Sequence, residues 1–273
     1  GYYEGKAITF HKYSDKRTEA VCEHFGTCGG CKWQHMDYSH QLFYKEKEVV
    51  NNLTRIGHLE LPEITPILGS KEQYFYRNKM EFSFSDSRWL TVEEIASTND
   101  LGDRNALGFH IPGMWDKILD VKKCWLQGDP SNAIRNEVKD FAIKHQIPFF
   151  NTRHQTGVLR TLMIRNTSIG ELMIVVQFFK DDSKNRIALL DHLKITFPEI
   201  TSLQYIINGK ANDTIYDQDV ICYHGRDHIF EKMEGLHFKI NAKSFYQTNS
   251  NQAFNLYKIT RDFALRLVKK GSN

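Results

Sequence analysis

Short stretches of alternating or continuous apolar residues recur along the chain, and they predict β-strands. Between residues 80 and 84 every second side chain is apolar, which is the pattern of a strand with one buried face. Two longer apolar stretches, 159–165 and 172–179, flank the polar segment 166–170 and together predict a β-hairpin. The other strands that the pattern predicts lie at 7–10, 117–121, 202–207, 219–223, 228–233 and 236–240.

Apolar residues three or four positions apart predict helices between these strands. The first helix follows Asp37 or Ser39, because either side chain can cap its first turn. Further helices are expected at 92–96, 131–142, 184–193 and 250–269. Strands that follow one another in runs, with helices between the runs, are typical of α+β proteins. We therefore predict an α+β fold with a mostly antiparallel or mixed sheet.

Composition narrows the class of protein without identifying it. The chain has 273 residues, of which 41% are hydrophobic and 25% charged, and these are ordinary values for a globular protein of one or two domains. The net charge of +3 permits a nucleic-acid partner but does not require one. No apolar run approaches the roughly 18 residues of a membrane span, and no secretory segment opens the sequence. We therefore expect a monomeric, cytoplasmic protein with reduced thiols and no membrane partner.

Four of the five cysteines form a three-plus-one group that suits a [4Fe-4S] cluster. Cys22, Cys28 and Cys31 lie in one glycine-rich loop, and Cys124 lies far downstream. Such a cluster takes one thiolate per iron, and the glycines allow the loop to wrap around it. A zinc ion held by four cysteines and ordinary buried thiols are the alternatives, although zinc sites usually pair their cysteines two and two. A disulfide framework does not fit an odd count of five cysteines.

Aromatic and basic residues stand together in two places that could contact RNA. Tyr76, Arg77 and Lys79 lie just before the first apolar alternation, where rings can stack on unpaired bases and cations can neutralise phosphates. Arg160 and Arg165 frame a later strand and could hold a nucleic-acid backbone. The same residue types are common in ordinary sheets, so the pattern alone leaves both interpretations open. The sequence contains no P-loop, no dinucleotide-binding glycine motif and no nucleophile elbow.

Three segments taken together resemble the iron–sulfur RNA (uracil-C5-)-methyltransferases. They are the cysteine loop 22–31, the Tyr-Arg-Asn-Lys segment at 76–79, and the motif Phe-x-Gln-x-Asn at 245–249. The resemblance extends over roughly residues 20–268 and includes the segment that ends at Cys124. Enzymes of this family make 5-methyluridine in ribosomal or transfer RNA with S-adenosylmethionine.

The resemblance implies a chemistry and assigns residues to it. In this family a cysteine thiolate adds to C6 of a flipped-out uracil, and C5 can then attack the methyl group of S-adenosylmethionine. By the same resemblance Gln247 would contact S-adenosylmethionine, and Phe245 would line the uridine pocket. The [4Fe-4S] cluster would shape the RNA-binding face rather than transfer electrons.

The resemblance also predicts a domain order. Residues 1–21 would be the remnant of an N-terminal TRAM or OB-like barrel, and residues 22–234 the central iron–sulfur domain. Residues 235–273 would be the first elements of a truncated Rossmann-like methyltransferase domain. In the family the nucleophile and most of the cofactor site lie further on, so no catalytic residue is assigned here and the chain is expected to be inactive alone. Cys222 lies in the apolar stretch 220–223 and is expected to be a buried small side chain rather than a nucleophile.

Two other functions are compatible with the same residues. One is a non-catalytic RNA-binding module whose four cysteines hold zinc, and the other is a small electron-transfer protein. The presence of iron would separate the methyltransferase from the zinc module, and reversible reduction would favour electron transfer. The sequence does not distinguish ribosomal from transfer RNA as the substrate.

Overall fold

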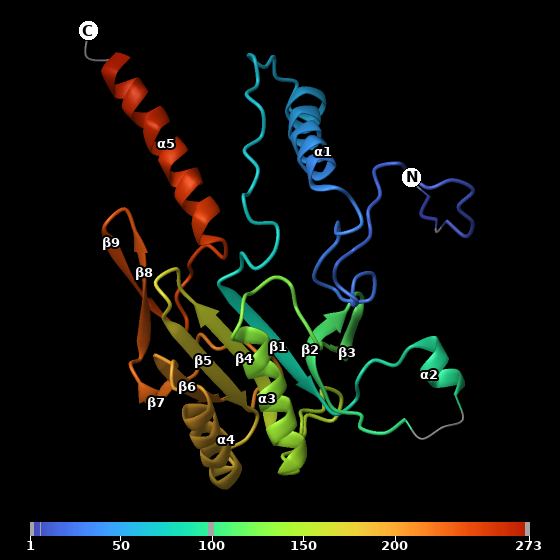
Figure 1. The fold of residues 1–273 in the computed structure, drawn as a ribbon, viewed down its shortest axis with the longest axis vertical. Helices are drawn as coiled ribbons and strands as arrows, with labels where there is room; N and C mark the ends of the chain where they lie inside the picture. Colours follow the sequence, from blue (N-terminus) through green and yellow to red (C-terminus); the bar gives the residue numbers. More distant parts are fainter. Residues whose placement is uncertain (1–2, 6, 98–100, 271–273) are drawn as a thin grey trace. The chain divides into compact units, whose positions relative to one another are not determined.

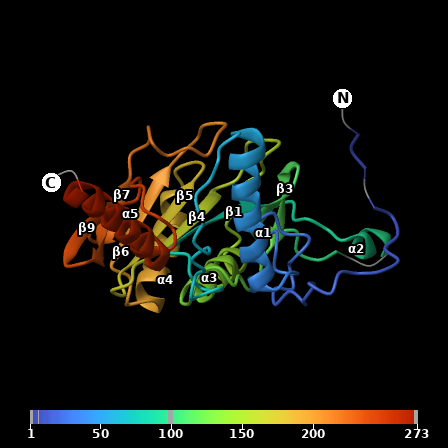
Figure 2. The same cartoon turned by 90° about the horizontal axis from the view of Figure 1, so that it is seen from above.

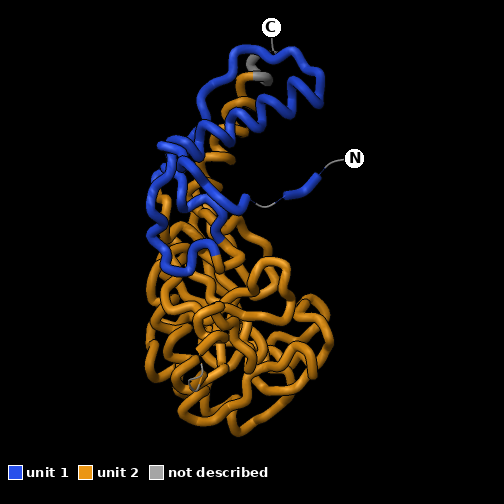
Figure 3. Tube along the Cα trace, turned by 90° about the vertical axis from the view of Figure 1, so that its right-hand side faces the viewer, with its two compact units in different colours: residues 1–26, 31–71 blue, residues 27–30, 72–273 orange. Residues whose placement is uncertain are grey.

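We describe the fold from a computed structural model of the chain, which describes residues 3–5, 7–97 and 101–270 (Figure 1). The chain divides into two compact units (Figure 3). The first comprises residues 1–26 and 31–71, and the second comprises residues 27–30 and 72–273. The tip of the cysteine loop therefore belongs to the second unit. The boundaries that we expected after residues 21 and 234 do not coincide with this division.

The first unit contains one long helix, α1 (Tyr38–Asn51), which continues into the π-helical turn η1 (Asn52–Ile56). The Asp37 carboxylate accepts a hydrogen bond from the backbone N–H of Ser39 at 2.9 Å, which confirms Asp37 as the cap. The strand predicted at 7–10 is not formed. Those side chains are exposed, so they gain none of the burial that stabilises a strand in a sheet.

The second unit is built on a seven-stranded mixed sheet with the order β3-β2-β1-β4-β5-β6-β7. Its neighbouring strands are antiparallel except for β5 and β6, which are parallel. The strands are β1 (Lys79–Ser85), β2 (Ala106–Ile111), β3 (Met114–Asp120), β4 (Leu159–Asn166), β5 (Leu172–Phe178), β6 (Ser202–Ile207) and β7 (Ile221–Gly225). The predicted hairpin is formed by β4 and β5, and the α+β fold with a mixed sheet is confirmed.

Helices α3 (Ser131–Lys144) and α4 (Ser183–Thr196) lie together on one side of this sheet (Figures 1 and 2). Helix α4 connects β5 to β6, and a crossover of this kind is what a parallel pair requires. Side chains along β5 point alternately to the two faces of the sheet. Ile174 accordingly belongs to the core that the helices cover, and Met173 belongs to a second buried cluster on the other face.

A two-stranded hairpin packs on this second face. It is formed by the antiparallel strands β8 (His228–Met233) and β9 (Leu236–Asn241), and Ile240 belongs to the same buried cluster as Met173. The domain boundary expected after residue 234 falls in the turn of this hairpin, between two strands that pair along their whole length. The long helix α5 (Ser250–Lys270) follows the hairpin.

The short helix α2 (Val92–Ala96) forms where the sequence predicts it. Thr91 and Glu94 make a reciprocal capping box, in which each side chain bonds the backbone N–H of the other residue. In the part of the chain that the structure describes, no helix is both long enough and apolar enough to cross a bilayer.

Truncation of Ile174 tests this assignment of the core. Ile174 is fully buried, so Ile174→Ala is expected to lower the free energy of unfolding by roughly 2–5 kcal/mol through lost burial and a residual cavity. Ile169 lies exposed in the turn between β4 and β5, and Ile169→Ala should change the same quantity by less than about 0.5 kcal/mol. Chemical denaturation measures both values. Equally small effects at the two positions would contradict the placement of Ile174.

Candidate functional site

The segment before β1 and the segment before α5 are joined through Asn78. Its side-chain amide donates to the Gln247 carbonyl at 2.8 Å and to the Ser250 hydroxyl at 2.9 Å. Its backbone N–H donates to the Thr248 carbonyl at 2.8 Å. Asn78 and Gln247 are 169 positions apart in sequence, so these bonds bring together the Tyr-Arg-Asn-Lys segment and the Phe-x-Gln-x-Asn motif.

A buried carboxyl group holds the first residue of α5. Glu231 on β8 is 1% exposed and accepts a hydrogen bond from the Ser250 hydroxyl at 2.9 Å. It also accepts bonds from the backbone N–H groups of Ser168 and Lys232, at 3.2 and 3.0 Å, and from the Ser168 hydroxyl. A buried acceptor is costly unless donors surround it, and here four donors do so. The contact therefore fixes Ser250, which in turn bonds Asn78.

Arg160 and Arg165, which the sequence predicts as RNA contacts, hydrogen-bond backbone carbonyls inside the protein. Both side chains are buried, and burial lowers the pKa of each guanidinium. The Arg165 guanidinium donates to the carbonyls of Asn241 and Ser244 at 3.0 and 2.8 Å, so it holds the turn after β9. The Arg160 guanidinium donates to the Asn208 carbonyl at 2.8 Å and to two further carbonyls of the same loop.

The side chains of the Phe-x-Gln-x-Asn motif are presented in different ways. Phe245 is 83% exposed, so its ring is open to a partner. Gln247 is half-buried. Its backbone carbonyl accepts the hydrogen bond from Asn78, and its side-chain amide takes no part in that bond. Tyr246 turns inward, and its hydroxyl is buried without a hydrogen-bond partner among the described residues. Burial, with a smaller contribution from Glu231, raises the pKa of Tyr246 to about 12.

Tyr76, Arg77 and Lys79 lie beside this segment and are half-buried. The backbone N–H of Arg77 donates to the Leu126 carbonyl at 2.8 Å. The Arg77 Nε atom is buried and has no hydrogen-bond partner among the described residues. Lys79 forms an ion pair with Glu81 at 2.6 Å, so part of its charge is neutralised within the protein.

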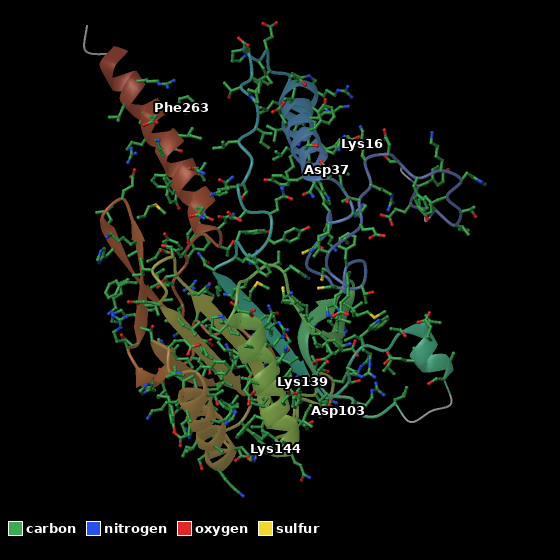
Figure 4. All side chains as sticks on the ribbon, viewed as in Figure 1. Lys16, Asp37, Asp103, Lys139, Lys144 and Phe263 are labelled. Atoms are coloured by element: carbon green, nitrogen blue, oxygen red, sulfur yellow. The ribbon has the colours of Figure 1, made fainter. Side chains whose placement is uncertain are left out.

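Cys124 lies in a turn that α3 holds in place. Its backbone N–H donates to Asn132 Oδ1 at 2.8 Å, and the Asn132 amide donates to the Cys124 carbonyl at 3.1 Å. The buried guanidinium of Arg135 donates to Asn132 at 3.0 Å, and burial lowers the pKa of Arg135 while Cys124 opposes that shift. Lys139, also on α3 (Figure 4), pairs with Asp120 at the end of β3 at 2.5 Å. The Cys124 backbone is therefore fixed on both sides.

The Cys124 turn also supports an aromatic residue in an unusual backbone conformation. Phe75 has a φ of 55°, a region that bulky L-residues rarely adopt. Its backbone N–H donates to the Trp125 carbonyl at 2.8 Å, and the centroids of the two rings are 5.4 Å apart. Backbone strain of this kind costs roughly 1–3 kcal/mol and is concentrated at functional sites.

The three cysteines of the loop form no disulfide in the part of the chain that the structure describes, and they are half-buried. In the first unit, burial and the neighbouring Cys31 both raise the pKa of Cys22, with burial the larger cause. In the second unit, the Cys28 sulfur accepts a hydrogen bond from the backbone N–H of Gly30 at 3.4 Å. Within the described residues, no group of three or more His, Cys, Asp or Glu side chains is placed to hold a metal ion. The four-cysteine cluster therefore stays a prediction.

Cys222 is not the buried side chain that the sequence predicted. It is exposed on β7, a strand at the edge of the sheet, and its sulfur lies 3.7 Å from the carbonyls of His224 and Gly225. Its apolar sequence neighbours do not bury it, because β7 is an edge strand beside β6 and its residues are exposed or half-buried. Partial desolvation and Asp227 raise the pKa of the thiol, so little thiolate forms near neutral pH.

Sequence reasoning missed two residues that shape this site. Glu231 occupies an inward position of β8, on the same strand face as the buried Ile229. A charged residue at an inward position of an alternating strand is a signal that could have found it. Trp125 supports Phe75 through its carbonyl and its ring, and no local pattern in the sequence indicates that contact.

Known proteins resemble this chain over nearly its whole length, although no family model matches it. Curated proteins named uncharacterized RNA methyltransferases from Bacteroides thetaiotaomicron, Porphyromonas gingivalis and Chlorobaculum tepidum are 55%, 51% and 37% identical to it. The matches cover 96%, 96% and 94% of this chain and 59%, 58% and 54% of those relatives, so the chain spans little more than half of their length.

A solved structure has the same fold. It is the Pyrococcus abyssi tRNA (uracil-54, C5)-methyltransferase in complex with S-adenosyl-L-homocysteine, with a TM-score of 0.64 and 24% identity. The match covers 92% of this chain and 52% of that chain. At this level of identity the likeness concerns the fold alone.

The strain at Phe75 can be measured by comparing two truncations. Phe75→Gly and Phe75→Ala both remove the ring, but only glycine adopts a φ of 55° without steric cost. We expect the Gly variant to have a free energy of unfolding about 1 kcal/mol higher than the Ala variant in chemical denaturation. The same pair at Trp115, in the strand β3, should show the opposite order because glycine weakens a strand. If the Gly variant were the more stable of the pair at both positions, the result would contradict backbone strain at Phe75.

Proposed function

We propose that this protein is an S-adenosylmethionine-dependent RNA (uracil-C5-)-methyltransferase that makes 5-methyluridine in ribosomal or transfer RNA. The observation that carries the proposal is the similarity, over 94–96% of the chain, to relatives named RNA methyltransferases. The solved structure with the same fold is named a tRNA (uracil-54, C5)-methyltransferase and holds S-adenosyl-L-homocysteine. We expect the protein to act as a monomer in the cytoplasm, where thiols stay reduced.

We assign Gln247 to the cofactor and Phe245 to the target base. The Gln247 side-chain amide can donate to S-adenosylmethionine, because Asn78 holds only the carbonyl of this residue. The exposed Phe245 ring offers an apolar face to a uracil that has left its stack. Arg165 and Asn78 fix the backbone on either side of Phe245, and a preorganised segment loses less conformational entropy on binding.

We assign RNA contact to Tyr76, Arg77 and Lys79, which lie next to this segment. Arg77 and Lys79 are half-buried rather than fully buried, so their charged groups can donate to phosphate oxygens. Arg160 and Arg165 are left out of the assignment, because their guanidinium groups are buried against backbone carbonyls.

We further propose that Cys22, Cys28, Cys31 and Cys124 hold one [4Fe-4S] cluster that shapes the RNA-binding face. The support is the three-plus-one spacing and the backbone N–H that bonds the Cys28 sulfur. Four thiolates also suit zinc, so the metal content decides between the two. The expectation that the 273-residue chain is inactive by itself stays a prediction.

Methyl transfer to RNA tests the proposed activity. The whole protein, given S-adenosylmethionine with a labelled methyl group and RNA from cells that lack the protein, is expected to form labelled 5-methyluridine. Mass spectrometry of the digested nucleosides detects the product. Gln247→Ala should weaken S-adenosylmethionine binding in calorimetry by roughly five- to tenfold, the value of about one hydrogen bond.

The matched control is Gln252→Ala, five positions further along the chain in the first turn of α5, which should leave that affinity unchanged. A methyl group on another atom, or no methylated nucleoside at all, would contradict the proposed function. Equal losses in Gln247→Ala and Gln252→Ala would contradict the assignment of Gln247 to the cofactor.

Iron content tests the cluster and its fourth ligand. Protein purified without oxygen is expected to hold about four iron atoms per chain. Cys124→Ala should lose most of this iron, whereas Cys222→Ala should retain it because Cys222 lies exposed on the edge strand β7. Elemental analysis with the visible absorption spectrum measures both. One zinc ion per chain without iron would contradict the proposed [4Fe-4S] cluster. Loss of iron in Cys222→Ala but not in Cys124→Ala would show that Cys222 is the fourth ligand.

A further inference from the structure

Three aromatic rings and two lysines form a patch at the Cys124 turn, which we name the aromatic patch. The rings belong to Tyr74, Phe75 and Trp125, and the exposed lysines are Lys122 and Lys123. Trp125 is central, because the ring centroids of Tyr74 and Phe75 lie 6.0 and 5.4 Å from its own. The Lys123 ammonium lies 3.9 Å from the same ring. The patch therefore combines flat apolar surfaces with positive charge.

Phe75 is unfavourable in two respects, its backbone conformation and the exposure of its side chain. Its φ of 55° is unfavourable for a bulky residue, and its ring is 45% exposed although aromatic rings gain from burial. Two backbone hydrogen bonds of 2.8 Å impose this conformation, from Phe75 to Trp125 and from Arg77 to Leu126. Strain that a fold maintains around an exposed side chain points to contact with a ligand.

We propose that the aromatic patch binds unpaired bases of single-stranded RNA. A base stacks on the exposed Phe75 ring, Trp125 supports that ring from the protein side, and the two lysines neutralise the flanking phosphates. Duplex RNA does not fit, because its bases are already stacked and paired. The choice of RNA rests on the proposed function, whereas the patch itself rests on the geometry of its five residues.

The patch is coupled to the methyltransferase segment through the backbone. Asn78 follows Phe75 by three positions and bonds the Gln247 and Thr248 carbonyls. Nucleotides stacked on Phe75 would therefore lie next to the segment that carries Phe245, and the patch would hold the strand that flanks the target uridine. This contact would strengthen RNA binding and position the target uridine relative to Phe245, but it takes no part in the chemical step.

Binding of a fluorescein-labelled, unstructured oligouridine to the 273-residue chain tests the proposal by fluorescence anisotropy. Phe75→Ala and Phe75→Gly should each weaken binding by about tenfold, the effect of losing one stacking ring, whereas Phe75→Tyr should bind like the unchanged protein. Replacing Lys122 and Lys123 together by Ala should reduce the slope of log affinity against log salt concentration by about 1.4, because two phosphate contacts are lost.

Two tryptophan variants serve as controls. Trp115 on β3 is 62% exposed and has the Arg153 guanidinium 5.6 Å from its ring, so it is a matched aromatic–cation pair outside the patch. Trp115→Ala should leave the affinity unchanged. Trp125→Phe keeps a ring behind Phe75, so it should retain most of the affinity while it abolishes the quenching of tryptophan fluorescence by bound RNA.

Several outcomes would overturn the proposal. They are an unchanged affinity in Phe75→Ala, an equal loss in Trp115→Ala, and equal competition by duplex RNA or by polyglutamate. Loss of binding through unfolding is recognised because Phe75→Gly and Phe75→Ala are expected to differ in stability but to share one affinity. The assay contains neither cofactor nor methyl transfer. If the proposed function is wrong but the aromatic patch does bind RNA, the 273-residue chain will still bind oligouridine in this assay. The whole protein will then form no methylated nucleoside in the methyl-transfer assay.

Discussion

The Arg165 guanidinium lies inside the protein, where the carbonyl oxygens of Asn241 and Ser244 replace the water that a cation normally binds. Because an unpaired buried charge would be far more costly than a paired one, the turn that supplies these carbonyls cannot move away from β4 without a large penalty. The turn leads directly into Phe245 and Gln247. The position of the motif thus depends on a strand in the middle of the sheet rather than on the motif's own residues.

This construction separates the groups that hold the site from the groups that can act in it. Glu231 and Asn78 are buried and hydrogen-bond the segments that carry the site, while Phe245 and Phe75 present their rings to solvent. A loop that is exposed on one side and bonded to a sheet on the other combines access with a fixed geometry. Substitution of a positioning residue is therefore expected to disturb the site without any contact with a ligand.

Local patterns predicted the regular elements of the sheet well, because the alternation along β1 and β5 is set by which face each side chain occupies. They predicted burial poorly where burial depends on whether a neighbouring strand is present. Cys222 stands among apolar residues, yet its strand ends the sheet, and the stretch 7–10 has the composition of a strand without a sheet to join. The residues of the Phe-x-Gln-x-Asn motif were identified by resemblance to a family. The hydrogen bond from Asn78 to Gln247 could not be predicted from local patterns, because the two residues are 169 positions apart in sequence.

The hydrogen bond from Asn78 to Gln247 also sets an order of events during synthesis. A ribosome that adds 5–20 residues each second needs roughly 8–35 s to pass from the first residue to the second. Throughout that interval the nascent chain contains the segment before β1 without the segment that it will hold, and for about the first half of it β1 also lacks its neighbour β4. The hydrogen bonds between Asn78 and the Gln247 segment can therefore form only after all seven strands of the sheet have been made.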